Sequence, residues 1–460
     1  MMSVPAFGVS LALLLAEGWC AVNLVLFSRS SREGLLLCLA LALPFAALFN
    51  VLLFLLFMLC GIPLTTVSLW IGHACIVAGL LLVRQFLPPT GHDSDPALLS
   101  SLRLPRIIIA LCLFILAGAL VYGFAHAWLL PPFQYDSFTN WLMRSKMSFL
   151  EQRLVFDNAF PHEAVRKPHY PFLVHALHLM ANAGQSSWRD QLASGMTFLL
   201  SVSLLFGSFL MIRRVVGASL ALFALTLVVG IPLFGLHLGE GYADHLLAEE
   251  GLAALAAFAL YRSSGRKSVL LLSGLLAAAA VWTKAEGMFF VFLPWLLLAL
   301  LSVRPLALRP LFPPLLLAAV WPVFLFLKGL AFTPHGSTDL LVDYHPESLR
   351  TVLSVLLYGG SFGPFWPLLF AGMVCLAIAS ARRSPGATFG GGDRRERLSL
   401  FLPGALCFAI VIGVYVFTPN VSYLLNGESF DRQLLTPAAM LVLPLVLCFA
   451  EFVKGRGEEG

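Results

Sequence analysis

Long apolar blocks separated by short charged turns most strongly constrain how this chain folds. Of its 460 residues, 59% are hydrophobic and only 12% are charged. A soluble protein of this length needs far more charge to cover its surface. An apolar block of about 20 residues has the length of a membrane-spanning helix. The sequence therefore predicts an all-α, polytopic transmembrane bundle that forms one integral membrane domain over residues 1–460.

Thirteen apolar blocks are candidate spans, and because some are short we expect about 11–13 true spans. The blocks lie near 6–27, 35–59, 64–83, 107–130, 191–212, 216–238, 246–261, 268–283, 288–302, 311–332, 364–381, 398–418 and 433–453. Cytoplasmic loops carry an excess of Lys and Arg. With the N-terminus outside, 19 of the 29 basic residues fall on the cytoplasmic side. The net charge of +5 is dispersed over short loops, so nucleic acid is not expected as a partner.

Two of the predicted outer loops are long. The first covers 131–190 and contains HYPFLVHALHLM at 169–180, which is typical of a short interfacial or re-entrant helix. The second covers 333–363 and ends in SLRTVLSVLLYGG, another candidate surface helix. The first loop is also the longest segment outside the predicted spans, so no separate soluble domain is expected.

Most other ionisable residues gather on the predicted outer side, where four turns carry charge. The turns contain PPFQYDSF at 131–138, HLGEGYADHLLAEEG at 237–251, TKAEG at 283–287 and NGESFDRQ at 426–433. Ionisable groups beside membrane spans are expensive and usually functional. Polar groups that converge in an otherwise apolar bundle therefore indicate a site.

The acidic residues of these turns have both functional and structural interpretations. Asp136 lies at a span end after two prolines, where a carboxylate suits general-base work on an acceptor hydroxyl or amine; it could equally cap the following helix. Glu240 and Asp244 precede a helix start, where acids favour the helix dipole. His245 and Glu249 are four residues apart and would share a helix face. This cluster could bind a divalent metal or orient basic groups, and the second is favoured because no regular metal-ligand spacing is present.

The basic and aromatic residues of these segments also have both a functional and a structural interpretation. Lys284 could snorkel from a helix end, although Glu286 lies two residues away. Arg432 opens the last span, where its planar fork of donors suits a phosphate; a structural pair with a carboxylate is the alternative. His169 and Tyr170 are typical interface anchors that could also line a sugar-binding cleft.

Taken in order, these motifs resemble those of the GT-C superfamily of integral-membrane glycosyltransferases. The resemblance rests on YDSFTNWLMRSK at 135–146, HYPFLVHAL at 169–177, GYAD at 241–244, TKAEG at 283–287 and the DR pair at 431–432. It covers most of the chain from 107 to 440, and it is carried by the order and shared outer location of motifs that are each short.

The resemblance implies a function and roles for individual residues. Such enzymes transfer a sugar from a polyprenyl phosphate to an acceptor on the outer face of the membrane. Asp136 would be the catalytic base and Asp244 a second acid that organises the centre, while Lys284 and Arg432 would neutralise the departing phosphate. Other residues of the same turns would contact the substrates: Tyr135, His169, Tyr170, Glu240, Tyr242, His245 and Glu286.

The chain also departs from the family pattern. Many members carry an acidic pair in the first outer loop, whereas here Ser137 follows Asp136. The loop follows the fourth predicted span, while the family usually has it after the first. Some relatives carry a soluble C-terminal domain, but here little sequence follows the last predicted span.

The sequence thus predicts an inverting glycosyltransferase that transfers a hexosyl or pentosyl group. Its acceptor would be a glycan, glycolipid or protein, and its expected location is a bacterial plasma membrane with the site facing outward or into the periplasm. A divalent metal is an optional cofactor. Two alternatives are a transporter or flippase for a lipid-linked sugar, and an O-antigen-type ligase or polymerase with a diphosphate-linked donor. Transporters place their charges near the midplane and often show inverted repeats, which this sequence does not.

Overall fold

The computed structural model describes residues 4–26, 32–86, 103–156, 167, 169–303, 308–330, 342–358, 360–381, 398–427 and 429–457. All elements of this part of the chain are helices. Those of the first half are α1 Val4–Leu26, α2 Arg32–Ala40, α3 Ala42–Cys60, α4 Thr66–Phe86, α5 Arg106–Leu129, η1 Ser137–Trp141, α6 Leu142–Glu151, α7 Leu173–Asn182, α8 Asp190–Val216 and α9 Ala218–Val229.

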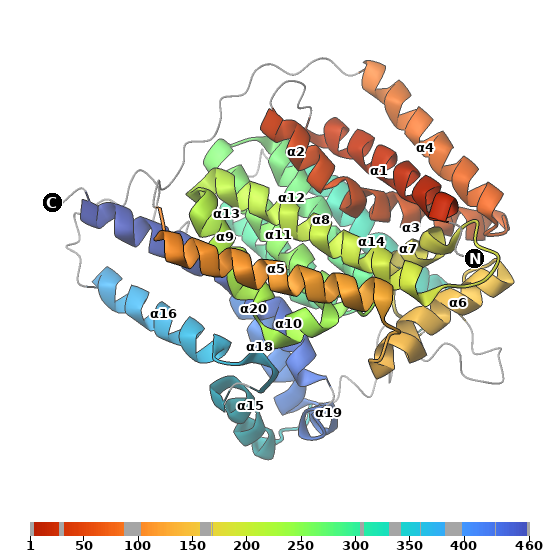
Figure 1. The fold of residues 1–460 in the computed structure, drawn as a ribbon. Helices are drawn as coiled ribbons and strands as arrows, with labels where there is room; N and C mark the ends of the chain where they lie inside the picture. Colours follow the sequence, from red (N-terminus) through yellow and green to blue (C-terminus); the bar gives the residue numbers. More distant parts are fainter. Residues whose placement is uncertain are drawn as a thin grey trace.

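The second half continues the helical bundle. Its elements are α10 Pro232–His237, α11 Asp244–Ser264, α12 Lys267–Thr283, η2 Met288–Phe292, α13 Leu293–Ser302, η4 Arg309–Leu311, α14 Phe312–Leu327, α15 Pro346–Tyr358, η6 Gly360–Phe362, α16 Phe365–Ala381, α18 Phe401–Phe417, α19 Val421–Leu425 and α20 Phe430–Gly457. In Figure 1 the long helices run alongside one another, and α15 and α19 lie together at one end, beyond α18.

The helices confirm the predicted all-α membrane bundle. Seven of those described are long and apolar enough to cross a membrane, or eight if the bent pair α15–α16 forms one span. The chain is therefore a multi-pass membrane protein. Four other predicted spans are shorter apolar helices of 10–17 residues, and at 1.5 Å per residue these do not reach across a hydrocarbon core of about 30 Å.

Helix α11 lies at the centre of the packing, against α8, α12 and α20. It begins at Asp244 and carries Arg262 in its last turn. Near that last turn, Arg262 donates to the carbonyl of Ser302 at 3.4 Å, and Arg266 donates to the carbonyl of Leu26 at 3.4 Å. Two of the basic residues predicted as cytoplasmic, Arg262 and Arg266, thus lie at the end of α11 opposite Asp244.

Helix α7 differs from the interfacial helix predicted at 169–180. All ten of its residues are buried, and it packs against α3, α6 and α8. His175 and His178 form the polar side of this amphipathic helix, but they bond to groups inside the protein and do not face a membrane surface. His178 contacts Ser145 Oγ at 3.1 Å and Thr197 Oγ1 at 2.8 Å, and His175 contacts Ser145 Oγ at 3.0 Å. These partners satisfy the polar side of α7 inside the protein, so it does not lie at the molecular surface.

Close packing in the N-terminal part depends on a glycine of α1. A Cβ atom added to Gly18 would lie 1.6 Å from the carbonyl oxygen of Ala42, a backbone atom at the start of α3. Gly8, in the same helix, has no atom within 4 Å of its Cβ position. The approach of α1 to α3 therefore requires glycine at one position and tolerates a side chain at the other.

We expect Gly18→Ala to lower the stability of the protein by about 1–3 kcal/mol, because the added methyl group must push α1 away from α3. The measurement is the apparent Tm in detergent or nanodiscs. Gly8→Ala is the matched control and should unfold at or slightly above the wild-type temperature, since alanine has the higher helix propensity. Equal Tm values for the two variants would contradict the α1–α3 packing.

Candidate active site

A cavity of about 940 Å³ opens where the starts of α11 and α20 meet the ends of α12 and α18. This volume is within the range of small-molecule sites. Its wall combines ionisable, aromatic and aliphatic residues from separate parts of the chain. The lining comprises Gln134, Tyr135, Asp136, Lys167, His169, Tyr170, Leu233, His237, Tyr242, Lys284, Ala285, Glu286, Phe289, Phe290, Ser361, Ile410, Val414, Tyr415, Asn420, Tyr423, Gly427, Ser429, Asp431, Arg432 and Gln433.

Asp136 and Arg432 form an ion pair in this wall. Asp136 lies between the end of α5 and η1, and Arg432 lies in the first turn of α20. Arg432 Nη1 donates to Asp136 Oδ2 at 2.6 Å and to the Tyr242 hydroxyl at 3.1 Å. The carboxylate side chain is 29% exposed, so a molecule in the cavity can reach it. The Nε atom of Arg432 is buried and has no hydrogen-bond partner among the described residues.

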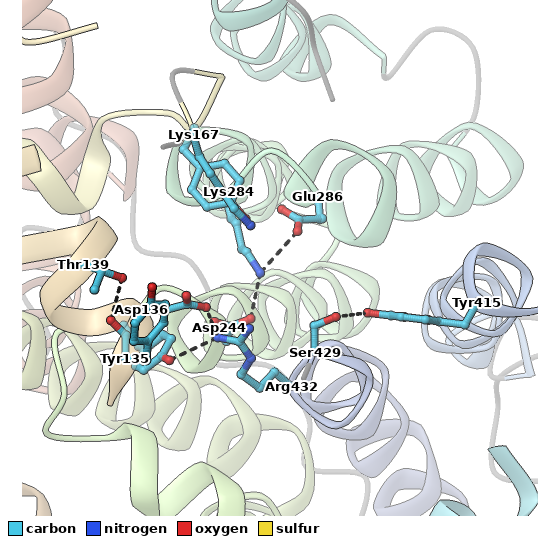
Figure 2. A network of polar contacts seen from close by, with 12 residues as sticks. Tyr135, Asp136, Thr139, Lys167, Asp244, Lys284, Glu286, Tyr415, Ser429 and Arg432 are labelled. Carbon is cyan, nitrogen blue, oxygen red and sulfur yellow. Dashed lines mark hydrogen bonds and ion pairs between the residues drawn. The ribbon is translucent and has the colours of Figure 1, made fainter. Parts of the chain in front are cut away.

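A second ion pair joins α11 to the segment after α12. Lys284 Nζ lies 2.8 Å from Asp244 Oδ1 and 3.3 Å from Glu286 Oε1 (Figure 2). Burial alone would raise the pKa of Asp244, but the nearby Lys284 and Arg432 hold it below its usual value. Burial likewise lowers the pKa of Lys284, and Asp244 and Glu286 outweigh this and raise it. Both groups are therefore charged at neutral pH.

The tight turn after Lys284 requires glycine. A Cβ atom on Gly287 would lie 1.9 Å from the carbonyl oxygen of Ala280. Gly287 N–H donates to the carbonyl of Lys284 at 2.9 Å. The turn folds back on the end of α12, so Lys284 and Glu286 both face the cavity.

Lys167 is a third cation in the wall. Its Nζ atom lies 3.4 Å from the Tyr170 hydroxyl, and 5.2 Å from the centre of that ring. In Figure 2 it lies beside Lys284, with Arg432 below both. Among the described residues, no carboxylate lies within 4 Å of its ammonium group. An anion can therefore bind Lys167 without breaking an ion pair between described residues.

His237 and Tyr242 stack in the wall, with ring centroids 4.6 Å apart and an interplanar angle of 11°. Burial lowers the pKa of His237 to about 4; Arg432 and Lys284 add to this, against the opposing effect of Asp244. The imidazole is therefore neutral at physiological pH, and the stack presents polar atoms without adding charge.

The structure brings eight of the predicted site residues to the cavity wall and places three elsewhere. The eight are Tyr135, Asp136, His169, Tyr170, Tyr242, Lys284, Glu286 and Arg432. Asp244 does not line the cavity; it accepts a hydrogen bond from the lining residue Lys284. Glu240 and His245 are fully buried outside the lining.

Glu240 holds the turn that carries Asp136. Its Oε2 atom accepts hydrogen bonds from the backbone N–H groups of Phe133 and Gln134, at 3.2 and 3.3 Å. Its Oε1 atom lies 3.2 Å from His126 Nδ1, and its backbone carbonyl accepts a hydrogen bond from Ser137. His245, on α11, packs edge-on against the Phe234 ring. Neither side chain is placed to touch a molecule in the cavity.

Sequence reasoning missed Lys167, His237 and Tyr415 as lining residues. Lys167 lies two residues before the HYP segment, and His237 opens the GYAD-containing turn, so both are close in sequence to predicted site residues. Tyr415 is in an apolar helix and bonds Ser429 Oγ at 2.6 Å (Figure 2); no sequence signal marked it. Glu428, in the last of the charged turns, lies outside the described residues.

The described residues contain no group of three or more His, Cys, Asp or Glu side chains arranged to hold a metal ion. Of the acids in this turn, Asp244 contacts Lys284, Glu240 accepts hydrogen bonds from backbone N–H groups, and Glu249 and Glu250 accept them from the hydroxyl groups of Ser201 and Thr283. Comparison of the chain with protein-family models, with curated proteins and with solved structures gives no match.

The depressed pKa of His237 predicts how stability depends on pH. The unfolded chain binds a proton at His237 below about 6.5, whereas the folded protein binds it only near 4. The stability that the neutral His237 contributes to the folded protein is complete above pH 6.5 and is lost as the pH falls toward 4. We expect the apparent Tm of His237→Phe, which keeps an aromatic ring against Tyr242, to fall less steeply than that of wild type over this window. Parallel curves would contradict a neutral buried His237.

Proposed function

We propose that the chain is an integral-membrane glycosyltransferase that transfers a sugar from a polyprenyl-phosphate donor to an acceptor at the non-cytoplasmic face. One observation carries the proposal: four segments far apart in sequence place an accessible carboxylate and three cations around one cavity. These segments carry the motifs that resemble GT-C enzymes, in the same order. The distribution of basic residues supports the outward orientation.

The two candidate acids suit different roles. The side chain of Asp136 is 29% exposed and lines the cavity, whereas that of Asp244 is 4% exposed and is bonded to Lys284. A general base must come within hydrogen-bond reach of the acceptor proton. Asp136 meets this requirement, and Asp244 acts through Lys284 by fixing its position and charge. This geometry favours Asp136 as the base.

The three cations suit the phosphate of the donor. Lys167, Lys284 and Arg432 all line the cavity. Preorganised cations stabilise the charge that develops on a leaving phosphate, and they do so strongly where water is excluded. Lys167 is available for direct binding. Lys284 and Arg432 already have carboxylate partners, so they contribute positive charge that those partners hold in place.

The other part of the wall is apolar, which suits the lipid carrier of the donor. Leu233, Phe290, Ile410 and Val414 line it, and the last two belong to the apolar helix α18. A polyprenyl chain gains free energy by leaving water for such a surface. A nucleotide-sugar donor would not use it.

The proposed reaction is a single displacement with inversion. Asp136 accepts the proton of the acceptor hydroxyl or amine, and the acceptor atom bonds to the anomeric carbon. The bond between that carbon and the phosphate oxygen breaks, and its electron pair leaves on the phosphate. The products are the glycosylated acceptor and the polyprenyl phosphate. The acceptor would be a glycan, glycolipid or protein.

We expect Asp136→Asn to abolish transfer of radiolabelled sugar from polyprenyl-phosphate monosaccharides to membrane acceptors. The amide cannot take the acceptor proton, and loss of a general base slows a reaction by about 10²–10⁴-fold. Asp343→Asn, at an exposed carboxylate, is the matched control and should keep wild-type activity.

Two outcomes of this assay would argue against the proposal. Full activity in a well-folded Asp136→Asn protein would remove Asp136 as the base. A wild-type protein that transfers sugar from no donor, but moves lipid-linked sugar across liposomes, would be a transporter; activity with a diphosphate-linked donor alone would make it a ligase or polymerase.

We expect Lys167→Met to raise the KM for the donor about 10–100-fold with a smaller change in kcat, because a charged hydrogen bond contributes about 1.5–3 kcal/mol. Initial rates over a range of donor concentrations measure both constants. Lys146→Met is the matched control, since Lys146 is exposed on α6, and its constants should stay at wild-type values. An unchanged KM in Lys167→Met would show that this ammonium does not bind the donor.

A further inference from the structure

Arg144, on α6, is a buried cation that the proposed reaction does not use. It is 1% exposed, and among the described residues no carboxylate lies within 4 Å of its guanidinium group. An unpaired buried charge destabilises a protein strongly unless hydrogen bonds compensate it. Arg144 is not a cavity-lining residue, so any part it has in the site acts through other residues.

The guanidinium group joins the two sides of the first long loop. Nε donates to the carbonyl of Val155 at 3.0 Å, and Nη1 donates to the carbonyl of Tyr170 at 2.8 Å. Its plane also rests over aromatic rings, 4.4 Å from the centre of Phe172 and 5.5 Å from that of Phe156. One side chain thus fixes the described residues on either side of 157–166.

Tyr170 is held from several directions. Arg144 holds its carbonyl, and its ring stacks on Trp141 with centroids 5.2 Å apart and an interplanar angle of 24°. Trp141 in turn stacks on His175, at 5.2 Å and 21°. The Tyr170 hydroxyl and ring contact Lys167, whose carbonyl accepts a hydrogen bond from Tyr170 N–H at 3.0 Å. A shift of the Tyr170 backbone therefore moves both the ring and Lys167.

We infer that Arg144 is a positioning residue that fixes the Tyr170 backbone and thereby holds the Lys167–Tyr170 pair in the cavity wall. The planar fork of arginine reaches two carbonyl groups at once. A lysine at this position keeps the charge but supplies a single nitrogen, and a glutamine supplies one neutral amide donor. The inference rests on the proposed function only in its choice of lipid phosphate as the anion that this pair would bind.

The first readout needs no activity. In the full-length protein in nanodiscs, mass spectrometry follows acylation of Lys167 by an amine-reactive ester, with Lys146 of the same chain as internal reference. We expect Arg144→Lys to accelerate acylation of Lys167 about fivefold, the effect of losing about one hydrogen bond, while Lys146 reacts as before. Arg153→Lys is the matched control, because Arg153 is 49% exposed, and it should leave both rates unchanged.

The second readout uses sugar transfer from the polyprenyl-phosphate donor. We expect Arg144→Lys to raise KM about tenfold with kcat nearly unchanged, because the misplaced pair weakens donor binding. A structural role alone would lower the amount of active protein, and hence the apparent kcat, without changing KM. If Arg144→Lys fails to fold, Arg144→Gln replaces it, since a neutral amide avoids an unpaired buried ammonium group.

The readouts separate the two proposals. Faster Lys167 acylation with no sugar transfer by wild type would keep the positioning role and reject the glycosyltransferase. Wild-type acylation rates in a folded Arg144→Lys or Arg144→Gln protein would overturn the positioning role, whatever the transfer assay shows.

Discussion

Charged groups persist inside an apolar bundle only when an opposite charge or hydrogen bonds compensate each of them, and the site depends on the contact between Lys284 and Asp244. Both side chains are more than nine-tenths buried and lie 2.8 Å apart. Loss of Lys284 would break this buried pair, which costs about 3–5 kcal/mol, whereas loss of Asp244 would leave Lys284 beside Glu286, 3.3 Å away. Because Asp244 begins α11 and Lys284 follows α12, the contact fixes the cavity ends of two packed central helices. Tyr242 lies two residues before Asp244 and Glu286 two residues after Lys284, so the same contact also fixes their positions.

The acids of the site divide by what they contact. Glu240 binds backbone N–H groups and so shapes the turn before Asp136. Asp244 binds an ammonium group, whereas Asp136 binds Arg432 and remains open to the cavity. Of these three acids, only Asp136 lines the cavity, where Glu286 and Asp431 also lie. Acids that are close together in the sequence thus divide into groups that face the cavity and groups that hold its frame.

The sequence predicted the fold class because lipid leaves the backbone few choices: each apolar block must satisfy its own hydrogen bonds, and a helix does so. It located the turns of the site for a similar reason, since charge between apolar blocks belongs at span ends. It could not assign α7, because a helix with one polar side suits either a membrane interface or a polar protein interior. It could not separate Glu240 and His245 from the lining, because side-chain direction at a helix start depends on packing between distant segments. Tyr415 gave no signal, since a tyrosine in an apolar helix has the pattern of a core residue.

The same pairing rule bears on how the proposed donor would bind. The cavity wall holds Arg432 against Asp136 and Lys284 between two carboxylates, while Lys167 contacts only a phenol among the described residues. A phosphate would therefore meet Lys167 first, and would then share Arg432 with Asp136. When N–H groups of Arg432 donate to the phosphate, the carboxylate oxygens of Asp136 would be free to accept a hydrogen bond from the acceptor. Binding of the donor and release of the base would in this way be one rearrangement of a single set of charges, and neither needs an unpaired charge in the apolar interior.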